Sequence, residues 1–168
     1  MIEIKDMQTP DDMKGKSYVH YKAWHEAYSG IVDEAYLDVV TLEKCEEITE
    51  NWPDNVLVAK DGDRVVGFCG YGPYRDNTMP DCGEVYSLYI LADYYDKGVG
   101  FALMNTVAER LSAYKTIALW VLKDNDRAIR FYERYGFRFD GTEQEIMLGT
   151  SKTECRMIFN RGDTCGNT

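Results

Sequence analysis

The sequence predicts one α/β (α+β) domain, built on a mixed, mainly antiparallel central sheet with helices on both faces and one parallel βαβ crossover. Three observations support this fold class. A strand pattern at 85–91, a helical pattern at 99–111 and a second strand pattern at 117–122 form a strand, helix, strand unit, which is typical of a parallel pair. The turn Asp61-Gly62-Asp63 predicts a hairpin. Two further strands are expected at 137–139 and 153–159.

Composition limits the possible functions. The 168 residues predict a single domain, 1–160, followed by a polar tail at 161–168, and 45% hydrophobic residues are enough for a core. A net charge of −10 argues against binding to nucleic acid or an anionic membrane, and it favours a cationic or neutral partner. Five cysteines without a Cys-x-x-Cys pair predict no disulfide framework and no metal site. Together with the lack of a long apolar stretch, this predicts a cytoplasmic protein. Homodimer formation stays open.

The N-terminal region begins with an expected strand at 2–5, and Asp11 and Asp12 are candidate N-caps for a helix after it. Aromatic residues then recur at helical spacing up to Gly30, which is expected to end the helix. Such a face is either core or one wall of a substrate pocket. Its members are Tyr21, Trp24, His25 and Tyr28.

The middle of the chain is expected to be helical in two pieces that follow Asp33 and Thr41 and stop at Pro53. Its many glutamates are interpreted as a solvated face, with attraction of a polyamine or a lysine-rich protein as the alternative. The hairpin strands are expected at 55–60 and 64–71, with a loop at 72–83 before the central strand.

The crossover carries the strongest functional signal, at the turn between its first strand and its helix. Gly98 and Gly100 stand where the helix begins, and the first amides of a helix lack partners and carry partial positive charge. The turn therefore predicts a phosphate-binding seat. It lacks the Gly-Lys-Ser/Thr ending of a nucleoside-triphosphate loop, and Leu103 stands where a dinucleotide fingerprint has its third glycine. A dinucleotide site with Asp124 is a weaker alternative.

A second motif follows the second strand, and the two motifs together resemble the GCN5-related N-acetyltransferase (GNAT) superfamily. The turn matches the family's Gln/Arg-x-x-Gly-x-Gly/Ala pattern at Gly98 and Gly100, although Tyr95 replaces the usual Gln or Arg. Asp96 adds a carboxylate there, and Lys97 is a candidate to compensate for it. The second motif keeps the family's full spacing: Asn125-x-x-Ala128-x-x-Phe131-Tyr132-x-x-x-Gly136-Phe137.

The resemblance implies an N-acetyltransferase that uses acetyl-CoA as the acetyl donor, without a metal. It implies that Tyr132 is the acid that protonates the leaving thiolate, since a phenol with a pKa near ~10 stays protonated at neutral pH. The coenzyme's pyrophosphate would bind the turn, its pantetheine arm would pair with the central strand, and Asn125 would contact that arm. The implied cofactor-binding residues are Leu88, Tyr89, Ile90, Tyr95, Asp96, Lys97, Gly98, Val99, Gly100, Phe101, Asn125, Ala128 and Tyr132.

Glu84 is the carboxylate on the central strand that could remove the amine's proton, directly or through water. A two-residue period places it on one face with Tyr86, Leu88 and Ile90. Cys82 as a covalent nucleophile is the weaker alternative, because no histidine is near it in sequence.

The acceptor is expected to be a primary amine, either of a small cationic, polyamine-like molecule or of a protein. Trp24, His25 and Tyr28 are the candidate substrate contacts, because the family's first helix borders the acceptor site. The alternative function is a non-catalytic acetyl-CoA-binding sensor or structural protein, which the departures at Tyr95 and Asp96 keep open.

Overall fold

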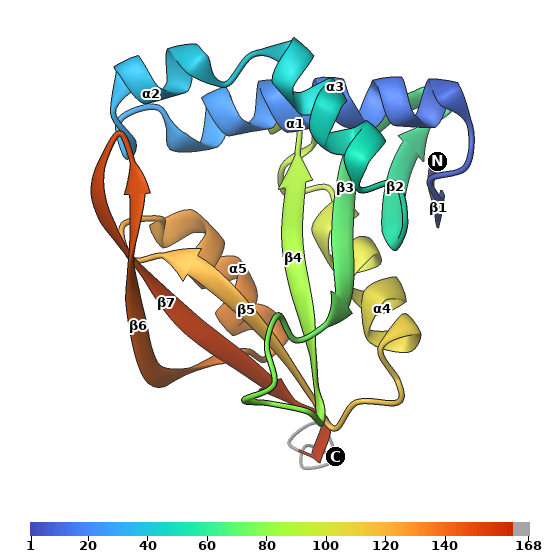
Figure 1. The fold of residues 1–168 in the computed structure, drawn as a ribbon. Coiled ribbons are helices and arrows are strands. Elements are labelled where there is room, and N and C mark those ends of the chain that lie inside the picture. The colour runs from blue at the N-terminus through green and yellow to red at the C-terminus, as the bar shows by residue number, and fades with distance from the viewer. Residues whose placement is uncertain (163–168) are drawn as a thin grey trace.

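The fold is a seven-stranded sheet in the order β1-β2-β3-β4-β5-β7-β6, with helices packed around it (Figure 1). The computed structural model describes residues 1–162. All strand pairs are antiparallel except β4 and β5, so the predicted mixed sheet with one parallel crossover is confirmed. The elements are β1 Ile2–Asp6, α1 Pro10–Tyr28, α2 Glu34–Val39, α3 Leu42–Asn51, β2 Val56–Asp61, β3 Arg64–Pro73, β4 Cys82–Ile90, a 3-10 turn Ala92–Tyr94, α4 Val99–Arg110, β5 Thr116–Leu122, α5 Asp126–Tyr135, β6 Arg138–Leu148 and β7 Thr150–Asn160.

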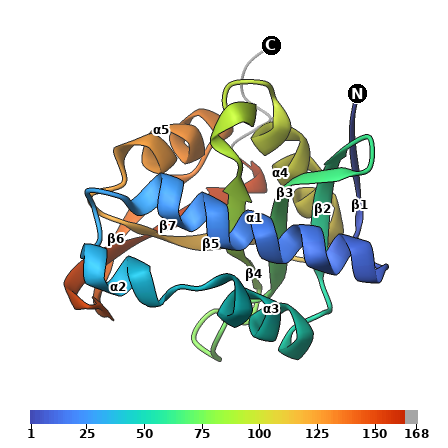
Figure 2. The same ribbon diagram turned by 90° about the horizontal axis from the view of Figure 1, so that it is seen from above.

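The parallel pair opens soon after it begins. β4 and β5 are paired only from Cys82 with Thr116 to Glu84 with Ala118. Beyond these residues the two strands diverge, and α1 lies across the open end with α2 and α3 beside it (Figures 1 and 2). The rest of β4 therefore has no ladder partner on the β5 side.

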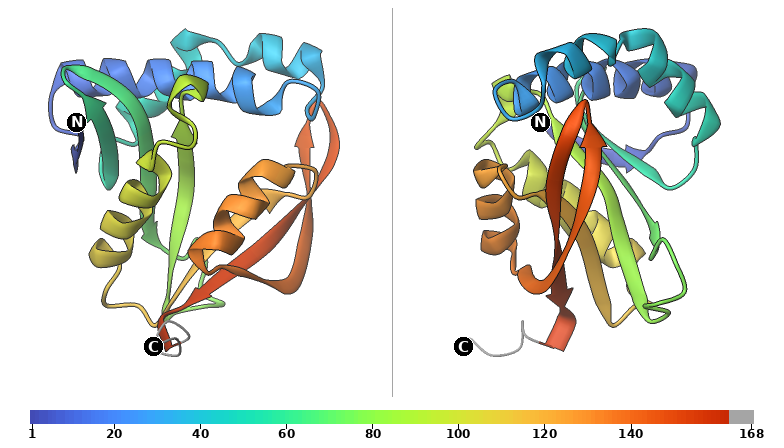
Figure 3. Two further views of the ribbon diagram at one scale, coloured as in Figure 1. Left: turned by 180° about the vertical axis from the view of Figure 1, so that it is seen from behind. Right: turned by 60° about the vertical axis from the view of Figure 1, so that its left-hand side comes forward.

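The two faces of the sheet bury separate apolar clusters. α4 and α5 cover one face, where Leu103, Met104 and Val107 pack with Leu57 and Phe137 (Figure 3). α1 covers the other face through the buried side chains Val19 and Ala23, which pack with Val58 and Phe68 of β2 and β3. The predicted helices on both faces are confirmed.

Helix capping follows the sequence with one correction. α2 and α3 follow Asp33 and Thr41 as predicted, and these two residues are the N-caps of the helices. α1, however, is capped by Thr9, whose hydroxyl accepts from the Asp12 N–H while Asp12 accepts from the Thr9 N–H. This reciprocal pair satisfies two helix-end donors at once, which a lone aspartate cap would not do.

A β-bulge in β4 overturns the predicted face of Glu84. Gly70 pairs with Ser87, but the next residue, Tyr71, pairs with Val85, so one extra residue is inserted in β4. The insertion shifts the two-residue alternation. Val85 therefore joins Leu88 and Ile90 in the core against α4, and Glu84 does not share their face.

At the C-terminal end, the guanidinium of Arg161 donates to the backbone carbonyls of Ala108, Leu111 and Tyr114. The predicted polar tail is thus anchored at its first residue, and 163–168 lie outside the described residues. In the described part of the chain, Cys45, Cys69, Cys82 and Cys155 are free thiols, and no helix there is long and apolar enough to cross a membrane.

Candidate active site

One cavity of about 950 Å³ lies where β4 and β5 part. On one side it is bordered by the turn before α4, the start of α4 and by α5; we call this the α4 side. On the other side it is bordered by side chains from α1, β5 and β7; we call this the α1 side. Between the two sides lies the part of β4 that pairs with β3 but has no partner on the β5 side, from Val85 to Ile90.

The α4 side contains the predicted anion seat, and its two glycines serve different ends. Gly98 has φ of 81° and is the N-cap of α4 without any capping side chain, so the first amides of the helix are not covered by its own cap. A Cβ on Gly100 would lie 2.8 Å from the ring of Phe131. Gly100 is therefore required for close packing of α4 against α5, whereas Gly98 is required by the turn.

The turn's unusual residues are balanced by an arginine that the sequence analysis did not single out. The guanidinium of Arg127, on α5, lies 3.6 Å from the ring centroid of Tyr95, and its Nη2 is 3.8 Å from an Asp96 carboxylate oxygen. Lys97, the predicted compensating cation, instead lies over the ring of Tyr94 and does not line the cavity. Both Tyr95 and Asp96 line it.

Tyr132 is placed so that its hydroxyl can act as a donor. It lines the cavity, its ring packs on Phe131 and Phe137, and its hydroxyl has no hydrogen-bond partner among residues 1–162. Burial raises the pKa of Tyr132 well above its usual range, so the phenol keeps its proton. Asn125, at the start of the same helix, caps it by accepting from the Ala128 N–H at 3.2 Å.

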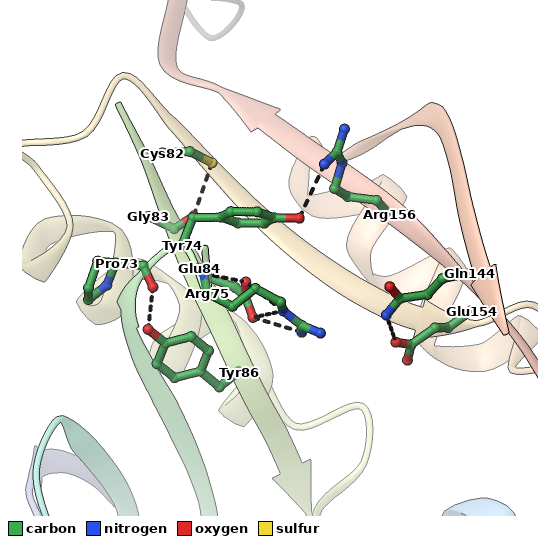
Figure 4. A network of polar contacts seen from close by, with 10 residues as sticks. All are labelled: Pro73, Tyr74, Arg75, Cys82, Gly83, Glu84, Tyr86, Gln144, Glu154 and Arg156. Atoms are coloured by element: carbon green, nitrogen blue, oxygen red, sulfur yellow. Dashed lines mark hydrogen bonds and ion pairs between the residues drawn. The ribbon is translucent and has the colours of Figure 1, made fainter. Parts of the chain in front are cut away.

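Glu84 lies next to this cavity but does not line it. Its side chain is fully buried, and both carboxylate oxygens accept from the guanidinium of Arg75, with Nη2 to Oε2 at 2.8 Å and Nε to both oxygens at 3.1 Å (Figure 4). Arg75 itself lines the cavity and lies over the ring of Trp120. The structure therefore separates Glu84 from the cavity by an arginine. Cys82 is buried as well, outside the cavity lining, and burial raises the pKa of its thiol.

The α1 side is aromatic and carries one carboxylate. Trp24 and Tyr28 line it as predicted, together with Trp120 of β5 and Glu154 of β7. One oxygen of Glu154 accepts from the side-chain amide of Gln144 (Figure 4). His25, the third predicted substrate contact, does not line the cavity. Its Nε2 lies 3.0 Å from the carbonyl oxygen of Val40 instead.

The comparisons with known proteins agree with this geometry. The model of the acetyltransferase (GNAT) family matches residues 19–137, which include the anion seat and the whole second motif through Phe137. The chain belongs to the acetyltransferase (GNAT) family. This membership confirms the predicted fold and the predicted enzyme class, an acetyl-CoA-dependent N-acetyltransferase.

Individual relatives place the chain among N-acetyltransferases. It is 29% identical over 142 residues to the uncharacterized N-acetyltransferase YuaI of Bacillus subtilis, covering 80% of this chain and 79% of that protein. It superposes with the PaiA N-acetyltransferase of Thermoplasma acidophilum, solved in complex with coenzyme A, at a TM-score of 0.71, with 20% identity over 95% of this chain and 99% of the other. A ribosomal-protein-alanine N-acetyltransferase from Brucella melitensis gives 0.72, with 20% identity over 94% and 99%.

The sequence predicts the α4 side of the GNAT site more completely than the α1 side. All predicted cofactor-binding residues except Lys97 line the cavity. Arg75, Trp120 and Glu154 were not predicted, because they come from three distant segments and carry no local motif. The arginines of α5 that line the cavity were not predicted either, although their helical spacing is visible in the sequence. Among residues 1–162, no cluster of three His, Cys, Asp or Glu side chains could hold a metal ion.

Proposed function

We propose that this protein transfers the acetyl group of acetyl-CoA to a primary amine of a small cationic, polyamine-like molecule. The main support for this proposal is that one cavity joins an anion seat, a phenol without a hydrogen-bond partner and an aromatic wall with a carboxylate. Acetyl-CoA supplies a thioester carbonyl and a thiolate leaving group. The chain must bind this donor and admit the amine. It must also accept the proton that the amine loses and supply a proton to the leaving thiolate.

The α4 side fits the donor. The helix amides after Gly98 are suited to the pyrophosphate, since they are partly positive and face no capping side chain. The unpaired stretch of β4 offers backbone groups to the peptide-like pantetheine arm, from Leu88 to Ile90. Backbone N–H groups at the bulged strand can also stabilise negative charge on the carbonyl oxygen.

Tyr132 is assigned as the acid. When the new C–N bond forms and the C–S bond breaks, the sulfur gains negative charge and the phenol can supply its proton there. The absence of another partner for the Tyr132 hydroxyl supports this role, as does the raised pKa of Tyr132, because the group stays protonated until the sulfur needs it.

Glu84 as the base stays a hypothesis. A lysine-like amine has a pKa of ~10.4 and must lose a proton before attack. Because Arg75 covers the Glu84 carboxylate, the burial of Glu84 supports only an indirect route through water.

A cationic acceptor is favoured by the α1 side. Trp24 and Tyr28 line the cavity, and aromatic rings attract ammonium groups, whereas the ring of Trp120 already has the guanidinium groups of Arg75 and Arg156 over it. Glu154 adds a carboxylate with one oxygen not used by Gln144. The chain's net charge of −10 would also draw a cation toward it.

The test is acetyl-CoA-dependent acetylation of an amine panel containing spermidine, a lysine-rich peptide, a peptide with a free N-terminus and an uncharged amine. Acetylated product should be detected by mass spectrometry, because thiol reagents would also react with the chain's five cysteines. Spermidine should give the highest kcat/KM, and that value should fall with added salt as attraction is screened over ~10 Å at 0.1 M. A better peptide substrate would make the acceptor a protein, and acetyl-CoA binding without any product would favour the sensor function.

A further inference from the structure

Helix α5 carries a row of arginines along one flank of the cavity. Arg127, Arg130 and Arg134 recur at i, i+3 and i+7, which places them on one side of a helix. All three are exposed, and all three line the cavity. We call these three residues the arginine stripe.

The stripe is not explained by ion pairs within the protein. Arg130 and Arg134 form no ion pair with any residue in 1–162, although the chain has ten more acidic than basic residues. The contact of Arg127 with Asp96 joins two exposed side chains at 3.8 Å, so water screens it. Among residues 1–162, the acidic side chains therefore leave Arg130 and Arg134 without an ion-pair partner.

The charges of the stripe have opposing effects on α5 itself. Arg127 lies in the first turn of α5, where the helix dipole disfavours positive charge, and Arg130 and Arg134 are like charges at i, i+4. Arg134, however, lies in the last turn, where the dipole favours a cation, and Asp126 is an opposite charge four residues before Arg130. The stability of the helix therefore does not explain the stripe.

The stripe begins at the anion seat and continues away from it. Its first member stacks on Tyr95 in the turn before α4. On the same helix Phe131 packs against Gly100 and Phe101 in the first turn of α4. A ligand whose pyrophosphate lay on that turn would therefore have Arg130 and Arg134 beside its more distal part.

We propose that the arginine stripe binds the 3′-phosphate of coenzyme A and makes the enzyme selective for the 3′-phosphorylated donor. This inference rests on the proposed function. Coenzyme A carries a third phosphate on the ribose that follows the pyrophosphate, and a phosphomonoester is close to dianionic at neutral pH. Guanidinium groups bind phosphate oxygens through paired N–H donors. Arg127 has a second role in this arrangement, because it offsets the Asp96 carboxylate beside the pyrophosphate.

The test is isothermal titration calorimetry with coenzyme A and with 3′-dephospho-coenzyme A. The unaltered protein should prefer coenzyme A by about tenfold or more. The double variant Arg130→Gln/Arg134→Gln should lose that preference while its affinity for the dephospho form stays within about twofold. The matched control Lys14→Gln/Lys22→Gln removes two positive charges from exposed positions on α1 that do not line this cavity, and it should keep the preference.

Three outcomes contradict the inference. Equal affinity of the unaltered protein for both ligands would remove the 3′-phosphate from the site, and the stripe would then be a surface for an acidic partner. Equal weakening of both ligands in the arginine variant, or loss of the preference in the lysine control, would reduce the stripe to a general charge effect. If neither ligand binds the unaltered protein, the proposed function itself fails, and this result is distinct from the other three.

Discussion

The two sides of the cavity are built in different ways, although they share strand β4. The α4 side is formed largely by backbone: a left-handed glycine, the first amides of a helix and a strand edge without a partner. The α1 side is formed by side chains from segments far apart in sequence, with Trp24 on α1, Trp120 on β5 and Glu154 on β7. Backbone sites suit a ligand that all members of a family share, and side-chain sites suit one that varies between them.

The largest expected effect tests the chemistry between the two sides. Tyr132→Phe keeps the ring and its packing on Phe131 and Phe137 but removes the proton donor. We expect kcat to fall at least about a hundredfold, or roughly 2.7 kcal/mol, with little change in acetyl-CoA affinity. Steady-state rates and calorimetry measure the two quantities.

Tyr135→Phe is the matched control for that variant. Tyr135 is on the same helix, donates to Asn105 at 3.0 Å and does not line the cavity, so its loss should leave kcat nearly unchanged. A Tyr132→Phe enzyme that keeps more than half of its kcat, with chemistry shown to be rate-limiting, would make Tyr132 a packing residue.

The difference between the two sides also explains what could be predicted from the sequence. The α4 side depends on Gly98, Asn125 and Tyr132, which lie within one strand, helix, strand, helix segment, so their spacing alone fixes their relative positions. Arg75 and Glu154 come together only after β3, β4, β5 and β7 have paired. No local pattern encodes that meeting.

The bulge in β4 shows the limit of local periodicity most directly. The two-residue period of a strand placed Glu84 with Leu88, but one inserted residue reversed the alternation between them. Such an insertion is set by the pairing of β3 with β4, and the sequence of β4 alone does not reveal it.

The next prediction concerns the ion pair under the α1 side. Glu84→Gln removes the buried carboxylate that accepts three guanidinium hydrogen bonds from Arg75. We expect the free energy of unfolding to fall by about 2 kcal/mol, which is less than for a fully buried pair because Arg75 is 43% exposed and can be hydrated. Denaturant unfolding measures this. Asp81→Asn, at an exposed position just before β4, is the control and should change stability by less than about 0.5 kcal/mol.

Glu84→Gln also tests the general-base hypothesis when it is compared with Arg75→Gln. Arg75→Gln keeps the Glu84 carboxylate but breaks the ion pair. If Glu84 takes the proton, Glu84→Gln should lose far more kcat than Arg75→Gln. Similar losses in both variants would limit Glu84 to positioning Arg75.

A smaller effect is expected from the carboxylate that faces the cavity. Glu154→Gln should raise KM for spermidine about tenfold, or roughly 1.4 kcal/mol, because it removes one charged partner of an ammonium group. KM for an uncharged amine should change by less than twofold. Glu145→Gln is the control, since Glu145 is exposed, accepts from Ser151 and Thr153, and lies outside the cavity lining. An equal effect on charged and uncharged amines would contradict the electrostatic role.

The smallest expected effect concerns His20, a residue of α1 that packs behind the aromatic rings of the α1 side. His20 lies between Phe68 and Tyr89, and its Nδ1 is buried without a partner. Burial, and then the nearby charge of Lys16, lower the pKa of His20 to about 4. The unfolded chain, with an ordinary histidine pKa near ~6.5, therefore binds more protons between pH 4 and 6.5. Stability must rise with pH across this window and fall as the pH drops through it.

His20→Phe removes this contribution while it keeps an aromatic ring between Phe68 and Tyr89. From pH 7 to pH 5.5 we expect the unaltered protein to lose about 1 kcal/mol more free energy of unfolding than the variant, as measured by urea unfolding at each pH. Carboxylates that titrate in the same range are common to both proteins and cancel in the difference. If the free energy of unfolding changes equally with pH in both proteins, His20 is accessible to water in the folded state. The side chains behind the aromatic wall would then be hydrated.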